Sequence, residues 1–316
     1  MGNLQTPPSV QKLQSALHAK AKGEPGYRFY LLYDKVYRAD VLDHAYRCCR
    51  ANKGAAGVDG QRFEDIESYG VERWLGELAQ RLRDKTYEPA VRRVRIPKPN
   101  SEQKRPLGIP TITDRVVQMA MLLVLDPIFE SDLAPEQFGY RKDRGAHDAV
   151  RAVHGLLNTG HTQVIDADLS GYFGQYSARG ADAMRGPSRG RSAGAAPAQG
   201  LLVAPVEDND GTGHPRRTRE NRDKQRGTPQ GAPISPLMSN LHETIRSGWK
   251  RLGFERRWSA KVVVYADDFV ILCKQGADEA FDAMRWMMQR LKLTVERGQD
   301  ARVRIPQGKR STNQGL

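Results

Sequence analysis

Acidic residues stand beside two short stretches of β-branched and bulky apolar residues. Asp267 and Asp268 connect Val262–Val264 to Phe269–Leu272, a pattern that predicts two buried strands joined by a tight turn. Carboxylates next to a buried strand are well suited to hold a divalent cation, which prefers oxygen ligands. Taken alone, the pair is equally compatible with a solvated Asp-Asp turn.

A second acidic strand is predicted upstream, at Val164–Phe173. Asp166 and Asp168 are two residues apart, so both side chains point to the same face of a strand. Two acidic strands can face one pair of cations. Two such cations, about 3.5–4 Å apart, activate an attacking hydroxyl and stabilise the leaving group. The spacing therefore predicts a metal-dependent reaction centre built from both strands.

Basic residues indicate a polyanionic partner. The chain has 316 residues, a formal net charge of +13 and a pI near 9.7, a balance typical of nucleic-acid binding. One basic group belongs to a predicted hairpin and consists of Lys98, Lys104 and Arg105. A second group belongs to a predicted loop and consists of Arg216, Arg217, Arg219 and Arg222. Each group can hold phosphates, and each can instead be a solvated charged surface.

Two further features suit a bound nucleotide. The segment from Gly227 to Leu237 combines glycines, prolines and one amide, Gln230, and glycines such as Gly231 let a ligand approach the backbone closely. Phe173, five residues after Asp168, can pack against a sugar or belong to the core.

Helical periodicity predicts helices at residues 9–24, 41–50, 64–84, 146–157 and 278–291, and a buried helix that begins at Asp114 as its N-cap. Residues 174–200 have too few apolar side chains to order themselves, and residues 296–316 have no periodicity. Cys48, Cys49 and Cys273 form no disulfide or zinc pattern, which indicates a reducing compartment. Since the sequence has no apolar run of about 20 residues, we expect a cytoplasmic protein without membrane segments.

Several motifs together resemble one family. Asp168–Phe173, Gln230–Leu237 and Tyr265–Asp268 occur in the order and spacing of the reverse-transcriptase palm. The segments Asn52–Asp59 and Ile96–Pro110 resemble the fingers of bacterial group II intron-encoded reverse transcriptases, which also act as maturases. The resemblance covers residues 1–173 and about 201–295.

The resemblance implies an α+β right-hand fold with an antiparallel palm sheet. It divides the chain into a helical extension (1–24), fingers (25–160), a palm (161–295) interrupted by a disordered segment (174–200), and an aberrant unstructured tail (296–316), with no thumb. The implied activity is RNA-directed DNA synthesis on dNTPs and a DNA primer, with group II intron RNA as partner.

The resemblance also implies individual roles. Asp168, Asp267 and Asp268 would hold two Mg²⁺ ions. Phe173 would be the steric gate beside the sugar, with Lys98 and Arg105 on the incoming dNTP. Gln230 would pack near the nascent base pair, next to Gly231.

One departure from the family stands out. Members continue Gly-Tyr-Phe with Asp and an amphipathic helix, whereas here Gly174 follows. Reading the possible codons of Gly174–Asp182 from their second base permits Asp-Ser-Ile-Pro-His-Ala-Glu-Leu-Met, the expected continuation, and a similar shift applies to Glu296–Val303. We therefore predict that 174–200 and 296–316 are out of frame and that the chain is a defective polymerase.

Two other classes of function remain open. One is a non-catalytic RNA-binding protein that assists splicing, and the other is a different bacterial reverse transcriptase of the retron or defence type. The acidic residues favour an enzyme over the first, and the fingers motifs favour the intron family over the second.

Overall fold

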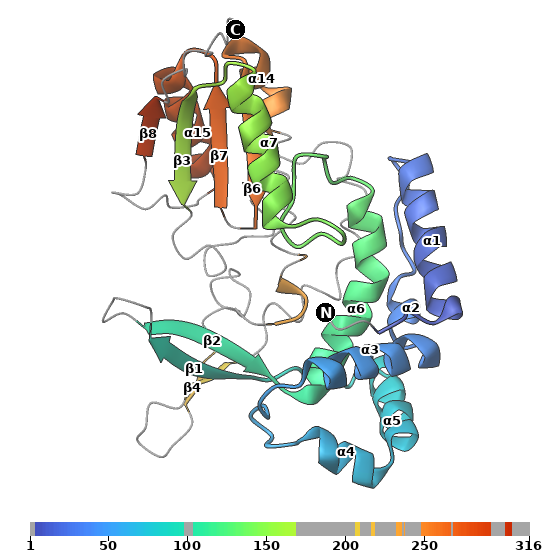
Figure 1. Cartoon of the computed structure of the whole chain (residues 1–316). Helices are drawn as coiled ribbons and strands as arrows, with labels where there is room; N and C mark the ends of the chain where they lie inside the picture. The colour runs from blue at the N-terminus through green and yellow to red at the C-terminus, as the bar shows by residue number, and fades with distance from the viewer. Residues whose placement is uncertain are drawn as a thin grey trace, which may run out of the picture. The chain divides into compact units, whose positions relative to one another are not determined.

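The computed structural model describes residues 4–97, 104–168, 206–208, 216–218, 232–235, 237, 248–266, 268–291 and 301–304. The chain forms two compact units, coloured along the chain in Figure 1. The first comprises Met1–Leu133 and Phe173–Leu241, and the second comprises Ala134–Tyr172 and His242–Leu316. Within the described residues, no helix is both long and apolar enough to span a membrane.

Helices dominate the first unit. They are α1 (Pro8–Gly23), α2 (Tyr33–Val36), α3 (Ala39–Asn52), α4 (Phe63–Tyr69), α5 (Val71–Arg83) and α6 (Ile112–Glu130). Helix α6 is apolar on most of its surface because α1, α2 and α3 all pack against it. The single helix predicted at 64–84 is two helices, interrupted at Gly70 with a φ of 104° that glycine tolerates best.

The start of α6 differs from the prediction. Thr111, not Asp114, is the N-cap: its side chain accepts a hydrogen bond from the Asp114 backbone N–H at 3.0 Å. Asp114 occupies the N3 position, and its buried carboxylate accepts from the Thr111 N–H and the Tyr87 hydroxyl. The two residues form a capping box, which places the helix start before Asp114.

A four-stranded sheet completes the first unit. Its strands are β1 (Val91–Pro97), β2 (Lys104–Pro110), β4 (Val206–Asp208) and β5 (Arg216–Thr218), in the order β2-β1-β4-β5. β1 and β2 form the predicted antiparallel hairpin, with Val91 opposite Pro110 and Pro97 opposite Lys104. Part of the predicted basic loop is therefore strand β5.

Two arginines hold the glycine-rich loop 52–60 in place. Arg92 of β1 donates to the Ala56 carbonyl at 2.9 Å, and Arg115 of α6 donates to the Ala55 carbonyl. A Cβ at Gly57 would lie 2.5 Å from Cα of Thr111, so only glycine permits this approach. These arginines have a structural role in the loop.

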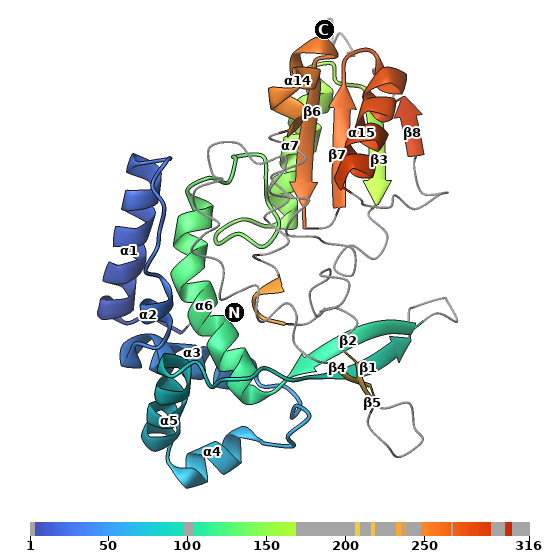
Figure 2. The same ribbon diagram turned by 180° about the vertical axis from the view of Figure 1, so that it is seen from behind.

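The second unit is built on an antiparallel sheet of order β6-β7-β3-β8. Its strands are β3 (Gln163–Asp168), β6 (Ala260–Tyr265), β7 (Asp268–Cys273) and β8 (Ala301–Arg304). Helix α7 (Ala146–Asn158) covers one face and α15 (Ala277–Leu291) covers the other, as Figures 1 and 2 show from opposite sides. The short helix α14 (Phe254–Arg257) precedes β6.

Strand register explains which residues are buried. Val263 and Leu272 face α7 and form a core with Phe138 and Ala149. Residues of the opposite parity, including Val262 and Ile271, face α15, whose buried residues are Ala280, Phe281, Met284, Met287 and Met288. The prediction for 278–291 included Ala280, Phe281, Met284 and Met288 in its apolar stripe but not Met287, and the side chain of Leu291, also predicted, lies outside the described residues.

The tail also differs from the prediction. We expected no regular structure over 296–316, but Ala301–Arg304 forms β8 and pairs with β3, with Asp166 opposite Ala301. The expectation was wrong for these residues because four residues can be ordered by backbone pairing with an edge strand. The segment 174–200 lies outside the described residues.

Candidate active site

The acidic hairpin forms as the sequence predicts. β6 and β7 are joined by a two-residue connection, with Tyr265 and Asp268 as the closing pair. Ala266, the first residue of this connection, has a φ of 57°. Tight hairpin turns require such positive φ values, and a non-glycine residue in this region carries conformational strain. Asp267 itself lies outside the described residues.

The sheet places one aspartate from each acidic strand at the same end. Asp168 of β3 lies directly opposite Asp268 of β7 in the antiparallel ladder, where opposite Cα atoms are about 4.5–5.5 Å apart. Like charges in directly opposite positions destabilise a sheet. A bound cation would convert this repulsion into attraction to a shared ligand.

Asp166 is near but lies farther along the strand. It pairs with Val270, two residues from the Asp168–Asp268 pair, and its side chain is exposed. By strand alternation it belongs to the same face as Asp168. Tyr265, which is 38% exposed, continues the row across β6. The acidic end, which we define as Asp166, Asp168 and Asp268, is thus accessible to solvent at Asp166 and Asp268.

A segment that sequence reasoning did not assign to the site supports the turn. The Phe138 N–H donates to the Val264 carbonyl at 3.0 Å, and the Val264 N–H donates to the Glu136 carbonyl at 3.3 Å. A Cβ on Gly139 would overlap the backbone nitrogen of Ala266. Glycine is therefore required where this segment crosses the hairpin. The Phe-Gly-Tyr-Arg sequence at 138–141 was the available signal.

Other residues predicted for the site are only partly described. Lys104 and Arg105 belong to β2, and Arg216 and Arg217 belong to β5, but only their backbones are described. The same holds for Asp168. Residues outside the described ranges are Lys98, Phe173, Arg219, Arg222, Gln230 and Gly231. Among the described side chains, no group of three or more His, Cys, Asp or Glu residues forms a cation site.

The geometry at the acidic end suits chemistry that needs negative ligands on a rigid frame. Backbone pairing sets the positions of Asp168 and Asp268, and carboxylate side chains are short, so few rotamers separate the backbone from the ligand atoms. Hard divalent cations bind such oxygen ligands. A cation held here can promote attack by a hydroxyl on a phosphoryl group.

The family is shown by direct comparison. The family described as reverse transcriptase (RNA-dependent DNA polymerase) matches residues 96–313, which is more than half of the chain. The protein therefore belongs to the reverse transcriptase family, whose activity is RNA-directed DNA synthesis. The α+β architecture, with helices and an antiparallel sheet, agrees with the fingers and palm of this family.

Individual relatives refine the placement. Protein YkfC of Escherichia coli K12 is 32% identical over 315 residues, covering 87% of this chain and 78% of YkfC. Group II intron-encoded protein LtrA of Lactococcus lactis is 34% identical over 146 residues, covering 46% of this chain. The aligned part is 24% of LtrA, so the match concerns only a portion of that protein.

A solved structure is also similar. A chain of a partial Cas6-RT-Cas1–Cas2 complex aligns with a TM-score of 0.42 and 20% identity, covering 83% of this chain and 42% of that chain.

Proposed function

We propose that this chain carries the reaction centre of a group II intron reverse transcriptase that transfers nucleotides with two Mg²⁺ ions. Asp168, Asp267 and Asp268 would hold the ions, which would activate the primer 3′ hydroxyl and stabilise the pyrophosphate that leaves. The observation that carries the proposal is the pairing of Asp168 with Asp268 across two strands. The similarity to LtrA, whose name includes a group II intron, supports the intron assignment.

The chain's own residues would bind and position the substrates. Lys98 and Arg105 would contact the dNTP phosphates, and Lys104 with the arginines of 216–222 would contact the nucleic-acid backbone. Phe173 would exclude a ribose 2′ hydroxyl, and Gln230 with Gly231 would lie beside the nascent base pair. Residues 25–160 would then form the fingers and residues 161–295 the palm, with intron RNA binding as a second, maturase role.

We further propose that this chain is a weak polymerase. Residues 174–200 stand where the family has a helix that supports the strand carrying Asp168. Two-metal catalysis requires accurate placement, and a displacement of about 1 Å can lower a rate on the order of a hundredfold. Sequencing of the gene tests the out-of-frame explanation: codons that do not permit the alternative reading of 174–182 would contradict it.

The decisive experiment compares Asp267→Asn with the unmodified sequence, in a version with both frames restored. Primer extension on an RNA template should fall at least about a thousandfold, or about 4 kcal/mol in the barrier, while RNA affinity stays within a factor of two or so. Substantial extension by Asp267→Asn would overturn the assignment of this residue. RNA binding without extension by either version would favour the non-catalytic, splicing-assisting protein.

A second comparison tests whether residues 174–200 lower the polymerase activity of this chain. Dividing the extension rate of the restored version by that of the present chain should give a ratio on the order of a hundred, the cost of displacing a catalytic group by about 1 Å. Equal rates would show that residues 174–200 do not limit catalysis.

A further inference from the structure

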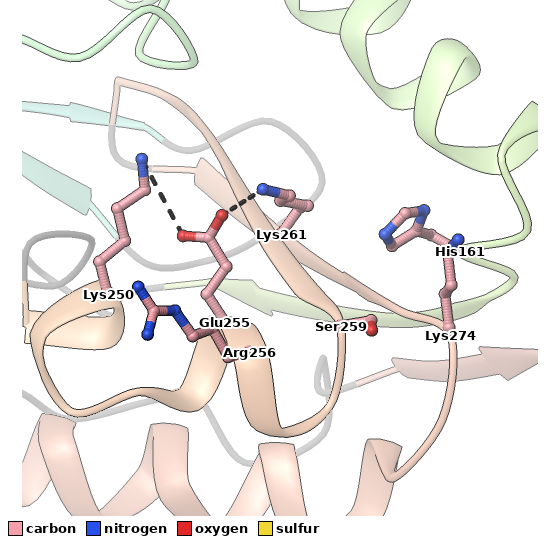
Figure 3. Close-up of a pocket in the computed structure, with 7 residues that line it drawn as sticks. All are labelled: His161, Lys250, Glu255, Arg256, Ser259, Lys261 and Lys274. Carbon is pink, nitrogen blue, oxygen red and sulfur yellow. Dashed lines mark hydrogen bonds and ion pairs between the residues drawn. The ribbon is translucent and has the colours of Figure 1, made fainter.

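A pocket rich in cations lies at the opposite end of the second unit's sheet from the acidic carboxylates. It is lined where β6 begins and β7 ends, and by α14 and the loop before β3 (Figure 3). Strand β6 has six residues, so at about 3.3 Å per residue the two ends are roughly 17 Å apart. The pocket has a volume of about 510 Å³.

The charges of the described residues in this pocket do not cancel. Its cations are Lys250, Arg256, Lys261 and Lys274, and Glu255 is the carboxylate among the lining residues. Glu255, whose side chain is 18% exposed, pairs with Lys261 and lies 3.9 Å from Lys250 (Figure 3). A second carboxylate, Glu136, lines an adjoining hollow. Counting both carboxylates, the cations remain in excess.

Arg256 and Lys274 provide this excess. Both are exposed, and neither has an ion-pair partner in the part of the chain that the structure describes. They approach the pocket from different elements, Arg256 from α14 and Lys274 from the end of β7. A phosphate that approaches either side chain would gain charge-assisted hydrogen bonds without having to break an existing ion pair.

An aromatic cluster packs beside the elements that carry the pocket's lining residues. Trp249, Phe254 and Trp258 pack with ring centroids 5.2–6.0 Å apart, and the Trp249 indole N–H donates to the Ala260 carbonyl at 3.2 Å. A Cβ on Gly276 would overlap the Trp258 ring. This aromatic cluster fixes the backbone that carries Arg256 and Lys261, so less ordering is needed when a ligand binds.

His161 also lines the pocket. Its Nδ1 lies 3.0 Å from the Thr159 hydroxyl and 3.2 Å from the Leu156 carbonyl. Because a carbonyl can only accept, a hydrogen bond to Leu156 assigns the proton to Nδ1. Burial, and then the charges of Lys274 and Lys261, lower the pKa of His161. An anion in the pocket would have the opposite effect, because it stabilises the imidazolium.

We propose that this pocket binds phosphate groups of an RNA backbone, at a position separate from the acidic end. Arginine and lysine are the usual partners of phosphate, and the cations come from several elements around a pocket of about 510 Å³. The net charge of +13 favours a polyanion, and the choice of RNA among polyanions rests on the proposed function. The anion-binding chemistry follows from the pocket itself.

The test measures affinity for a single-stranded RNA of about 20 nucleotides at several salt concentrations, without Mg²⁺ or dNTPs. The double variant Arg256→Gln with Lys274→Gln should weaken binding and reduce the slope of log affinity against log salt by about 1.4, since each lost single-strand contact contributes about 0.7. The matched control is Arg285→Gln with Arg290→Gln, two exposed positions on α15, which should change the slope less. Equal changes in both variants, or an unchanged slope in the pocket variant, would overturn the proposal.

A variant with the opposite expected sign excludes misfolding as an explanation. Glu255→Gln removes the carboxylate that pairs with Lys261 and should therefore strengthen RNA binding and steepen the salt slope. Weaker binding by a folded Glu255→Gln protein would count against the proposal. Inorganic phosphate at millimolar concentration should compete with RNA only in proteins with an intact pocket; phosphate binding that RNA does not displace would overturn RNA as the source.

The expected effect of the pocket variants on RNA binding is independent of catalysis. Repeating the binding measurements with Asp267→Asn should leave the effect of the pocket variants unchanged. Failure of the proposed polymerase activity would appear only in primer extension, and failure of the phosphate site only in the salt slopes.

Discussion

The two ends of the second unit's sheet use charge in different ways. At the acidic end, Asp168 and Asp268 lie opposite each other within the strand ladder. At the other end, Arg256 and Lys274 project from a short helix and a strand terminus, while Glu255 lies between Lys250 and Lys261. The acidic groups are short and placed by backbone hydrogen bonds, whereas the basic groups are long and adjustable.

This difference matches the ligands that each end suits. A metal ion needs ligands placed to within a few tenths of an ångström, which a strand ladder provides. A flexible polyanion needs charge more than fixed geometry, and long lysine and arginine side chains follow it easily. The same sheet can therefore support a reaction centre at one end and a binding surface at the other.

The largest expected effect on stability comes from disturbing the support of the acidic end. Gly139→Ala places a Cβ against the backbone of Ala266, so the hairpin or the 136–139 segment must move. Overpacking of this kind costs about 1–3 kcal/mol or more. Urea unfolding should show this loss, and primer extension by the restored enzyme should fall because the Asp267–Asp268 turn is displaced.

The control for Gly139→Ala is Gly155→Ala. Gly155 lies in α7, and a Cβ added there would meet nothing within 4 Å. Alanine in a helix is more favourable than glycine by about 0.5–1 kcal/mol, so this variant should be as stable as the parent or more so. Similar losses of stability in both variants would show that the close approach of Gly139 to Ala266 is not the reason why alanine destabilises position 139.

A smaller change in stability is expected from removing one negative charge at the acidic end. Asp268→Asn removes one of two like charges at paired ladder positions, so the metal-free protein should gain about 0.2–1 kcal/mol, the range for a cross-strand charge pair. The same variant should lose the stabilisation that Mg²⁺ gives the parent protein. Thermal unfolding with and without Mg²⁺ measures both changes.

Asp282→Asn, at an exposed position on α15, is the matched change in charge. It should alter neither the metal-free stability nor the response to Mg²⁺ by a comparable amount. If Asp268→Asn keeps the full response to Mg²⁺, the acidic end does not bind the ion.

The smallest expected effect concerns pH at the basic end. The pKa of His161 is lowered in the folded protein, chiefly by burial, so the unfolded chain binds this proton more readily. Stability from His161 is therefore present above its ordinary pKa, near 6.5, and is lost as pH falls through the lower folded value. The groups around it are Lys261, Lys274, the Thr159 hydroxyl and the Leu156 carbonyl.

His161→Asn should therefore flatten the decline in stability below about pH 6.5, the unperturbed histidine value, compared with the parent. Urea unfolding at a series of pH values provides the measurement. His154→Asn, at an exposed position of α7, is the control and should leave the pH profile unchanged. A parent-like acid decline in His161→Asn would assign the pH dependence to other groups.

Local patterns in the sequence determined much of the second unit. Alternation and β-branched residues located β3, β6 and β7, and apolar spacing located α7 and α15, because these signals depend on residues close together in the chain. The placement of Asp168 near the Asp267–Asp268 turn was a prediction from motif order. The ladder pairs Asp168 with Asp268, while Asp267 and the Asp168 side chain lie beyond what the structure describes.

Tertiary structure decided what local pattern does not contain. Gly139 meets Ala266 only because two distant segments cross, and β8 is a strand only because β3 offers it an edge. The N-cap of α6 is Thr111 and not Asp114, three residues away, and the helix predicted at 64–84 is interrupted at Gly70. Local sequence pattern does not distinguish between positions so close together. The basic pocket combines α14, β6, β7 and the loop before β3, whose charges are scattered in the sequence and gather only when the strands pair.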